Sequence, residues 1–328
     1  MRKPVVVVAD PLDPETLKEL HLCEVRTCDG RDPAALHAAL RDADALLIRS
    51  GTRVDEGALA AAPRLRVVAR AGVGLDNVDV AAATRHGVLV ANAPLSNVLS
   101  VAELTIGLIL SLMRNVLPAG SALRAGRWER ALYQGAELAG STVGIIGLGH
   151  VGTLVARRLA AFEVEVVAHD PYVAESHARS VGARLAGLDD LMGCSDVVTV
   201  HLPKNPATTG LVGERELALA KRSMLLVNTA RGGIVDESAL AVALKEQRLA
   251  GAALDVFDIE PAVGNPLLEF PNVLATPHLG ASTDEAQGRA GREAVAAVLR
   301  VLAGERPAHA VNATALGRDP SGSRTRTV

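Results

Sequence analysis

The amino-acid sequence predicts an α/β fold with two parallel sheets, each covered by helices on both faces. Short β-branched runs alternate with segments rich in alanine and leucine from the fifth residue onward, and this alternation is typical of doubly wound sheets. It stops near residue 92 and restarts near residue 141. The length of 328 residues also favours two domains. We therefore expect two separate α/β units.

The first predicted sheet lies within the first 92 residues. Its strands are expected at 5–9 (VVVVA), 45–49 (ALLIR), 66–71 (RVVARA) and 87–92 (GVLVAN). Segments with helical composition, such as DPAALHAALRDA at 32–43, separate these runs. Because the centres of these runs are apolar instead of alternating with polar residues, they predict strands that are covered by helices on both faces.

A helical region precedes the second predicted sheet. Residues 101–126 have helical periodicity that Pro118 interrupts, so we expect a long helix before this proline and a second helix after it. The expected strands that follow are 141–147, 164–169, 196–201, 224–229, 251–257 and 272–276.

The last predicted helix follows these strands, at residues 282–305. Ser282 or Thr283 is its expected N-cap, acidic residues occupy its first turn, and Gly304 marks its end. From Ala315 onward the sequence lacks apolar periodicity and predicts a frayed tail.

Composition and charge favour a small-molecule partner. The chain has 34 basic and 37 acidic residues spread along its length, which argues against a dedicated nucleic-acid or membrane-surface protein. The apolar run near the N-terminus is too short for a signal peptide, and Leu104–Met113 is far shorter than the ~20 residues of a membrane span. These features predict a cytoplasmic location. Cys23, Cys28 and Cys194 lack metal-site or disulfide spacing and are expected to be reduced.

A glycine-rich motif predicts a dinucleotide site. Gly147, Gly149 and Gly152 have the GxGxxG spacing between a predicted strand and a predicted helix, whose N-terminus can bind a pyrophosphate. Asp170 follows the next strand, 18 residues after Gly152, where a carboxylate can bind the adenosine ribose. A carboxylate there would repel the 2'-phosphate of NADP, so the motif favours NAD. The alternative interpretation is an aspartate that caps a loop before Pro171.

Three strand ends carry polar residues that predict chemistry. Arg231, Glu260 and His278 each follow a predicted strand, and ligands of doubly wound sheets bind outside the carboxyl ends of the strands. An arginine can hold a carboxylate, a histidine can transfer the proton that accompanies hydride transfer, and a glutamate can orient the histidine. Together they predict a 2-hydroxy-acid dehydrogenase. Taken singly, each residue has a structural alternative: a surface ion pair, a loop carboxylate and a structural histidine.

With these motifs the chain resembles the D-isomer-specific 2-hydroxyacid dehydrogenases. The resemblance covers about Val5 to Asn312 and is carried by RAGVGLDNVD (70–79), NAPLSNVLSVAEL (92–104), GIIGLGHVG (144–152), NTARGGIVDE (228–237), GAALDVF (251–257) and PHLGASTDEAQ (277–287). It implies an NAD-binding Rossmann domain inserted into a flavodoxin-like substrate domain. The implied boundaries are 1–95 with 286–315 for the substrate domain, 96–285 for the NAD-binding domain and 316–328 for a flexible tail.

The resemblance also implies roles for particular residues. Arg231 would bind the substrate carboxylate, Glu260 would orient the imidazole, and His278 would be the general acid–base. Implied cofactor contacts are Gly147, Gly149, His150, Val151, Gly152, Asp170, Leu202, Thr229, Ala230, Asp255 and Gly280, with Asp255 on the nicotinamide carboxamide. Implied substrate contacts are Arg49, Ser50, Arg70, Val73, Gly74, Arg127 and Arg130, of which Arg49, Arg127 and Arg130 are candidates for binding a phosphate. No metal site is expected.

Within the family, the chain is most similar to the branch that oxidises 3-phospho-D-glycerate to 3-phosphohydroxypyruvate. A hydroxypyruvate/glyoxylate or D-lactate type of dehydrogenase and an NADH-sensing corepressor remain alternatives. The chain stops soon after AVNA (310–313), so we do not expect the C-terminal domain with which some relatives sense serine. The apolar helix 101–117 and the segment SALRAGRW (121–128) are expected to build a homodimer, or a dimer of dimers.

Overall fold

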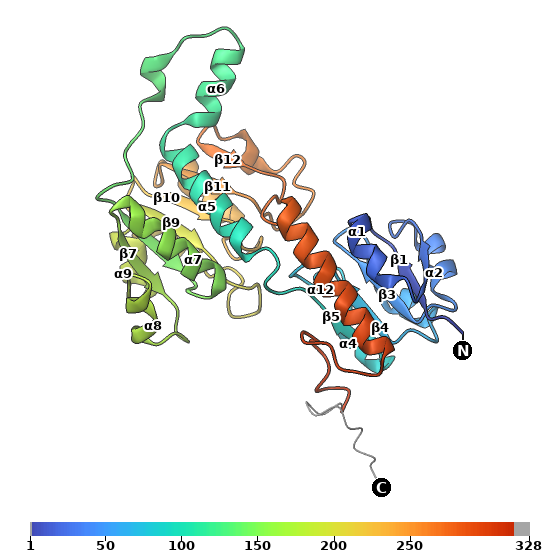
Figure 1. Ribbon diagram of the computed structural model, residues 1–328. Coiled ribbons are helices and arrows are strands. Elements are labelled where there is room, and N and C mark those ends of the chain that lie inside the picture. Colours follow the sequence, from blue (N-terminus) through green and yellow to red (C-terminus); the bar gives the residue numbers. More distant parts are fainter. Residues whose placement is uncertain (1, 318–328) are drawn as a thin grey trace. The chain divides into compact units, whose positions relative to one another are not determined.

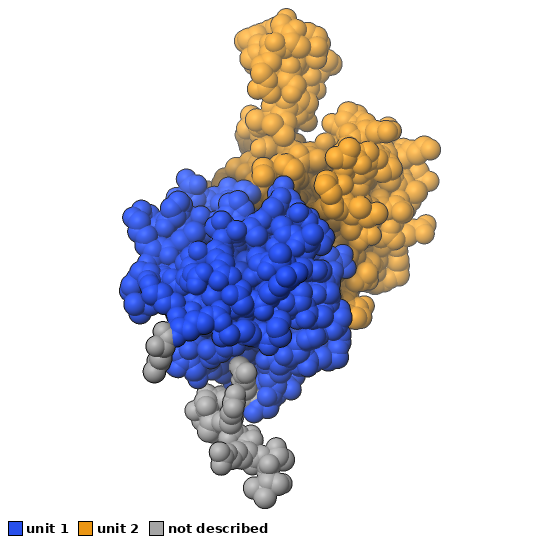
Figure 2. Space-filling view, turned by 90° about the vertical axis from the view of Figure 1, so that its right-hand side faces the viewer, with its two compact units in different colours: residues 1–97, 281–328 blue, residues 98–280 orange. Residues whose placement is uncertain are grey.

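The computed structural model describes residues 2–317 and contains two parallel sheets (Figure 1). The predicted fold class is therefore confirmed. Contacts divide the chain into two compact units, residues 1–97 with 281–328 and residues 98–280 (Figure 2). Most of the tail expected at 316–328 lies outside the described residues.

The five-stranded sheet of the first unit has the order β2-β1-β3-β4-β5, with every pair parallel. This is the flavodoxin-like order, in which the chain reverses direction between β1 and β3. The strands are β1 (Val5–Val8), β2 (Glu24–Thr27), β3 (Ala45–Ile48), β4 (Val67–Arg70) and β5 (Leu89–Ala91). Strand β2 was not predicted, because this edge strand is mostly exposed and its sequence EVRT carries one apolar residue.

Helices cover both faces of this sheet. They are α1 (Pro14–Leu17), η1 (Lys18–Leu20), α2 (Pro33–Leu40), α3 (Glu56–Ala60), α4 (Val80–Arg85) and α12 (Asp284–Leu302). Leu36 and Leu59 pack against one face and Val295 against the other, all nearly fully buried. Thr283 is the N-cap of α12, because its side chain accepts a hydrogen bond from Ala286 N. The predicted start of this helix is thus confirmed.

The seven-stranded sheet of the second unit has the order β12-β11-β10-β9-β6-β7-β8 and is parallel throughout. This is the Rossmann order, with its reversal point between β6 and β9. The strands are β6 (Thr142–Ile146), β7 (Glu165–His169), β8 (Ala183–Leu185), β9 (Val197–Val200), β10 (Leu225–Asn228), β11 (Gly251–Leu254) and β12 (Val273–Ala275). Strand β8 was not predicted, because it is a three-residue edge strand.

The second unit contains helices α5 (Val98–Met113), α6 (Val116–Arg124), α7 (His150–Leu159), α8 (Glu175–Ser180), α9 (Leu188–Cys194), α10 (Glu214–Leu219) and α11 (Glu237–Lys245). The short 3-10 helices are η2 (Arg130–Tyr133), η3 (Ala160–Phe162) and η4 (Pro266–Glu269). Helix α5 packs on the sheet and on α7, and Ile109 is fully buried there.

The break between α5 and α6 differs from the prediction. It falls at Asn115, which adopts φ +51°, and Pro118 lies inside the first turn of α6. A proline is tolerated there because the first backbone N–H groups of a helix have no partner within it. Within the described residues, no single helix is long and apolar enough to cross a membrane; α5 and α6 pass that test only as a pair, with a bend of 65°.

Candidate active site

The glycine-rich loop after β6 has the geometry that its motif requires. Gly147 adopts φ +95°, and a Cβ atom there would lie 2.6 Å from the carbonyl oxygen of His201. A Cβ atom on Gly152 would lie 2.1 Å from the carbonyl oxygen of Gly147, whereas one on Gly149 would meet no atom within 4 Å. The first and third glycines therefore permit close packing, and the second leaves the loop open to a ligand.

The N-terminus of α7 follows this loop. Among the described residues, the backbone N–H groups of His150 and Val151 donate to no protein acceptor, and they favour an anion such as a pyrophosphate. Asp170 Oδ2 accepts a hydrogen bond from Leu148 N at 2.9 Å, and its Oδ1 accepts one from Tyr172 N at 3.0 Å. The carboxylate is thus fixed beside the glycine loop. These groups fit a dinucleotide.

His278 and Glu260 form a hydrogen-bonded pair. His278 Nδ1 lies 2.8 Å from Glu260 Oε2, and the two side chains are 44% and 37% exposed. Glu260 Oε1 accepts a second hydrogen bond, from Phe257 N at 3.1 Å. An ionised carboxylate can only accept, so Nδ1 carries a proton and Nε2 is the ring atom left to exchange a proton with a ligand. The pair has the arrangement of a general acid–base with an orienting carboxylate.

The turn that carries His278 is held by Asp255. The buried Asp255 carboxylate accepts a hydrogen bond from Thr276 Oγ1 at 2.6 Å. It also accepts hydrogen bonds from Leu279 N at 2.6 Å and Gly280 N at 2.8 Å. His278 adopts φ +56°, a costly left-handed conformation for a residue with a Cβ atom, and these bonds hold it there. In this structure Asp255 therefore holds the turn of the histidine, and the nicotinamide contact that the resemblance implies for it stays a prediction.

Arg231 follows β10 in a turn shaped by the buried Asn228. Asn228 Oδ1 accepts a hydrogen bond from Ala230 N, and Asn228 Nδ2 donates to the carbonyl oxygen of Arg231, both at 3.0 Å. Arg231 Nη1 donates to Ala230 O at 2.8 Å. A Cβ atom on the next residue, Gly232, would lie 1.9 Å from the carbonyl oxygen of Phe257. The loops after β10 and β11 therefore pack directly against each other.

The other predicted cofactor contacts lie at the same edge of the sheet. Thr229 Oγ1 is buried 2.8 Å from Thr105 Oγ1 on α5. Leu202 follows β9, and its Cδ2 atom would lie 2.8 Å from a Cβ atom on Gly147. Gly280 packs against α5, so the strand-end loops and this helix meet. The carboxyl ends of these parallel strands thus bring the glycine loop, the arginine and the histidine pair to one edge.

The predicted substrate residues of the first unit lie at the carboxyl edge of their own sheet. Arg49 and Ser50 follow β3, and Val73 and Gly74 follow β4. The guanidinium of Arg70, the last residue of β4, donates to the carbonyl oxygens of Gly74 and Arg49, the second at 3.4 Å. This edge includes the reversal point between β1 and β3, where doubly wound sheets bind ligands.

Arg127 and Arg130 are not brought together with His278 within one chain. They lie in residues 116–134, which form an arm that projects from the C-terminal end of α5 (Figure 1). Arg127 is exposed and pairs with Glu129 at 3.1 Å. The active-site contacts of α5 lie near its other end, roughly 18 Å away for twelve residues at 1.5 Å per residue. In one chain these two arginines are therefore remote from the strand-end loops that carry His278 and Glu260.

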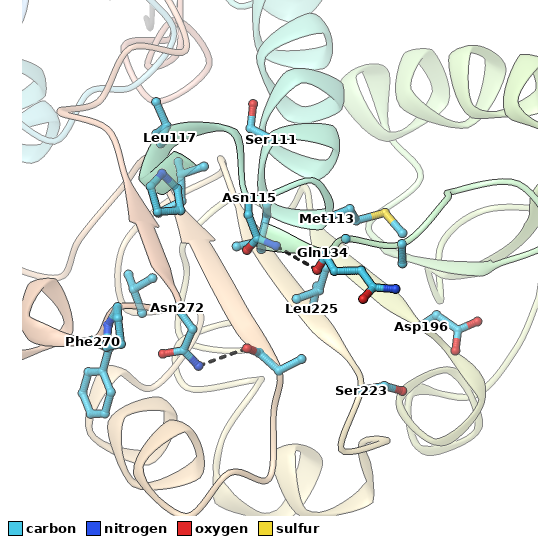
Figure 3. Close-up of a pocket in the computed structure, with 18 of the residues that line it drawn as sticks. Ser111, Met113, Asn115, Leu117, Gln134, Asp196, Ser223, Leu225, Phe270 and Asn272 are labelled. Atoms are coloured by element: carbon cyan, nitrogen blue, oxygen red, sulfur yellow. Dashed lines mark hydrogen bonds between the residues drawn. The ribbon is translucent and has the colours of Figure 1, made fainter. Parts of the chain in front are cut away.

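A hollow of about 680 Å³ lies at the amino edge of the seven-stranded sheet (Figure 3). The end of α5, the base of the arm and the first residues of β10 and β12 line it. Apolar side chains that face it include Met113, Leu117, Leu225 and Phe270. Because the glycine loop and His278 lie at the opposite edge, this hollow is not the dinucleotide site.

Sequence reasoning missed the residues that hold the turns of the candidate site in shape. Asn228, Gly232 and Thr276 set the turns after β10 and β12, as described above. Asn228 gave a usable signal, because it is a polar residue at the end of an otherwise apolar strand. Thr276 gave none, because its partner Asp255 lies 21 residues away.

The Rossmann strand order, the glycine loop and the histidine–glutamate pair are together typical of dinucleotide-dependent dehydrogenases. The chain belongs to the D-isomer specific 2-hydroxyacid dehydrogenases, whose NAD-binding domain matches residues 106–280. NAD is accordingly the cofactor of this domain, and small 2-hydroxy acids are the substrate class of the family.

Particular relatives refine this assignment. D-3-phosphoglycerate dehydrogenase of Mycobacterium tuberculosis is 51% identical over 313 residues, which cover 95% of this chain and 59% of the relative. The chain thus spans about 59% of the length of the first curated relatives that it matches. A solved NADPH-dependent glyoxylate/hydroxypyruvate reductase from Sinorhizobium meliloti has 31% identity and a TM-score of 0.84, covering 100% of both chains. D-lactate dehydrogenase from Aquifex aeolicus, solved with NAD and lactic acid, has 27% identity and a TM-score of 0.81, covering 92% of this chain and 96% of that one.

Proposed function

We propose that this protein is an NAD-dependent dehydrogenase that oxidises 3-phospho-D-glycerate to 3-phosphohydroxypyruvate, the first step of serine biosynthesis. The observation that carries the proposal is the His278–Glu260 pair at 2.8 Å, at the same sheet edge as the dinucleotide motif. Similarity to D-3-phosphoglycerate dehydrogenases at 40–51% identity supports this substrate. A cytoplasmic location is part of the same proposal.

The protein's own groups suit this reaction. Bound NAD supplies the acceptor for the hydride that leaves C2 of the hydroxy acid. His278 Nε2 takes the hydroxyl proton, while Glu260 holds Nδ1 and stabilises the imidazolium that forms. Arg231 binds the substrate carboxylate and places C2. Proton transfer by a positioned histidine contributes about 10² to 10⁴ to the rate.

The residues proposed to hold NAD are those of the glycine loop and its neighbours. The N–H groups at the start of α7 bind the pyrophosphate, and Asp170 binds the adenosine ribose. Leu202, Thr229 and Ala230 support the nicotinamide end. A carboxylate at position 170 disfavours the 2'-phosphate of NADP, so NADH should be preferred over NADPH when the two are compared at equal concentration.

The name of the S. meliloti relative provides the second candidate for the substrate. That relative is named a glyoxylate/hydroxypyruvate reductase and matches the whole chain, so hydroxypyruvate without a phosphate is the main competitor. For this chain, we propose that Arg49 binds the phosphate of the substrate. Arg127 or Arg130 would contribute only if the arm of a neighbouring subunit supplies them.

A substrate panel separates these possibilities. Purified protein and NADH would be given 3-phosphohydroxypyruvate, hydroxypyruvate, glyoxylate, pyruvate and 2-oxoglutarate, and kcat/KM measured for each. The proposal predicts the highest value for the phosphorylated acid. A higher value for hydroxypyruvate would contradict the proposed substrate. No reduction of any of the five acids would contradict the proposed enzyme and favour a protein that only binds NADH.

We also propose a homodimer built by the arm. Large apolar side chains on the arm are exposed, including Leu123 at 56%, Trp128 at 82% and Leu132 at 73%. The apolar hollow of Figure 3 lies at the base of the same arm, so two copies related by a twofold axis could each insert an arm beside the other's hollow. Such an exchange would bury apolar surface that one chain leaves exposed.

A further inference from the structure

The loop that carries Glu260 is joined to a neighbouring helix by one side chain. This loop, residues 258–265, leads from β11 to η4, and the helix is α11. Glu237, in the first turn of α11, accepts a hydrogen bond at Oε1 from Asp258 N at 2.5 Å. Its Oε2 accepts a second one, from Asn265 Nδ2 at 2.7 Å. A single carboxylate therefore holds the first and the last residue of the loop.

Packing contributes little to the position of this loop. Of its apolar side chains, Ala262 packs against the core of the unit, whereas Ile259 and Val263 are 77% and 92% exposed. A hollow of about 570 Å³ is lined by the loop and by the first turn of α11. Because close packing is what usually fixes a segment, its polar contacts matter more here than they would in a well-packed turn.

Two other neighbours restrain only the start of the loop. Lys204 Nζ pairs with Asp258 Oδ1 at 2.9 Å, but the two side chains are 36% and 57% exposed, and exposed ion pairs contribute little. A Cβ atom on Gly233 would lie 2.7 Å from the same oxygen of Asp258. Among these contacts, those of Glu237 alone reach both ends of the loop.

Glu260 lies between the two ends that Glu237 holds. Its Oε1 accepts a hydrogen bond from Phe257 N at 3.1 Å, and its Oε2 lies 2.8 Å from His278 Nδ1. A shift of the loop by about 1 Å would break the contact with the imidazole, and a misplacement of that size can cost up to about 10²-fold in rate. The geometry of the pair therefore depends on what holds the loop.

We propose that Glu237 is a positioning residue that acts through Glu260 and sets the hydrogen bond between Glu260 and His278. Helix α11 is a firm anchor for it, because Leu240 and Ala243 are fully buried in the core of the unit. Glu237 contacts the two ends of the loop and not the imidazole. The inference rests on the proposed function, since it concerns the pair that is proposed to move the proton.

A double-mutant cycle tests whether Glu237 acts through Glu260. The proteins are Glu237→Ala, Glu260→Ala and the combination of both, and kcat for reduction of 3-phosphohydroxypyruvate is measured per NADH-binding site, so that unfolded protein is not counted. Glu237→Ala should lower kcat about tenfold, and Glu260→Ala should lower it about 10²-fold. In the Glu260→Ala background, Glu237→Ala should lower kcat by less than about twofold, because no carboxylate is left to position.

Two further measurements accompany the cycle. The Kd of NADH and the KM for the oxo acid should stay within about threefold of those of the unmodified protein, since the expected loss lies in proton transfer. Glu237→Gln keeps one acceptor oxygen and can hold one end of the loop, so its kcat should fall between that of Glu237→Ala and that of the unmodified protein. Should Glu237→Ala fail to fold, the same cycle is measured with Glu237→Gln.

Glu216 is the matched structural control. It also lies in the first turn of a helix of the second unit, α10, where its Oε2 accepts a hydrogen bond from Gly213 N at 3.0 Å. Glu216→Ala should lower Tm and leave kcat per site unchanged. If Glu237→Ala behaves in the same way, or lowers kcat equally with and without Glu260, the inference is overturned while the proposed function stands. If the unmodified protein reduces no 2-oxo acid, the proposed function itself fails, and the inference fails with it.

Discussion

The partly buried imidazole of His201 should affect how the stability of the protein depends on pH. It follows β9, its Nε2 lies 3.0 Å from Thr199 Oγ1, and its Nδ1 is buried without a partner in the described structure. Desolvation lowers the pKa of His201 to about 3, because a charged ring would lose its hydration. The folded protein therefore holds this histidine neutral over most of the acid range.

The sign of the effect follows from linkage. The pKa of His201 is about 3 in the folded chain, against 6.5 for an ordinary exposed histidine, so the unfolded chain takes up the proton first as pH falls. Stabilisation is complete above about pH 6.5 and is lost progressively toward pH 3. Between pH 7 and pH 5 this one residue should cost about 2 kcal/mol of unfolding free energy.

Denaturant unfolding of the His201→Gln variant at pH 7 and pH 5 measures this contribution. Glutamine keeps a polar amide but does not titrate, so the loss of stability between the two pH values should be about 2 kcal/mol smaller than in the unmodified protein. Equal losses in the two proteins would show that His201 is not the titrating group.

At the scale of the element, the end of the α7–η3 helix is strained. Glu163 adopts φ +58° at the position after η3, where glycine is the residue that helices prefer. The side chain is exposed, so no lost contact offsets a replacement. Glu163→Gly should raise the free energy of unfolding by about 0.5–1 kcal/mol, because relief of the left-handed conformation outweighs the added freedom of the unfolded chain.

Lys245→Gly is a suitable control for that measurement. Lys245 is exposed and lies in the last turn of α11 with helical backbone, so glycine there should cost up to about 1 kcal/mol. Chemical denaturation of both variants would show opposite signs. A destabilised Glu163→Gly protein would contradict the strain assigned to this turn.

The sequence predicts the buried elements better than the exposed ones. Central strands such as β1 and β3 consist of apolar residues, and burial on both faces leaves few other options for such runs. The edge strands β2 and β8 escape prediction, because pairing with a neighbour rather than their own composition makes them strands. The position of Pro118 could not be predicted for a related reason. A proline is tolerated in the first turn of a helix, and the sequence did not show that α6 begins at Val116.

The residues of the candidate site also differ in how well the sequence predicts them. Residues that we propose to carry chemistry, such as His278 and Glu260, stand out in the sequence because a core would exclude them. Residues that hold a turn, such as Asn77 and Asn92, donate to backbone 19 to 28 residues away along the chain. Such a partner depends on the strand order, so composition and spacing give no sign of it.

At the scale of the whole molecule, the exposed apolar side chains of the arm predict a homodimer. A buried tryptophan or leucine at the centre of an interface commonly contributes about 2 kcal/mol or more. The double variant Leu123→Ser with Trp128→Ser should therefore weaken the dimer by at least about 30-fold in Kd. Tyr172→Ser is the control, because Tyr172 is 93% exposed and lies outside the arm.

Light scattering during gel filtration, over a range of protein concentrations, would report this change. The unmodified protein and the Tyr172→Ser control should elute with the mass of at least two chains. The arm variant should dissociate at a higher protein concentration than either of them. An unmodified protein with the mass of one chain at micromolar concentration would contradict the proposed dimer.

The most direct test of the account is the effect of His278→Ala on NADH-dependent reduction of 3-phosphohydroxypyruvate. The control is His86→Ala, because His86 Nε2 pairs with Glu56 Oε1 at 2.6 Å in the first unit, outside the proposed site. We expect His278→Ala to lower kcat by about 10² to 10⁴ with the Kd of NADH unchanged, and His86→Ala to leave both unchanged. A His278→Ala enzyme with kcat near that of the unmodified protein would contradict the assignment of His278 as the proton carrier.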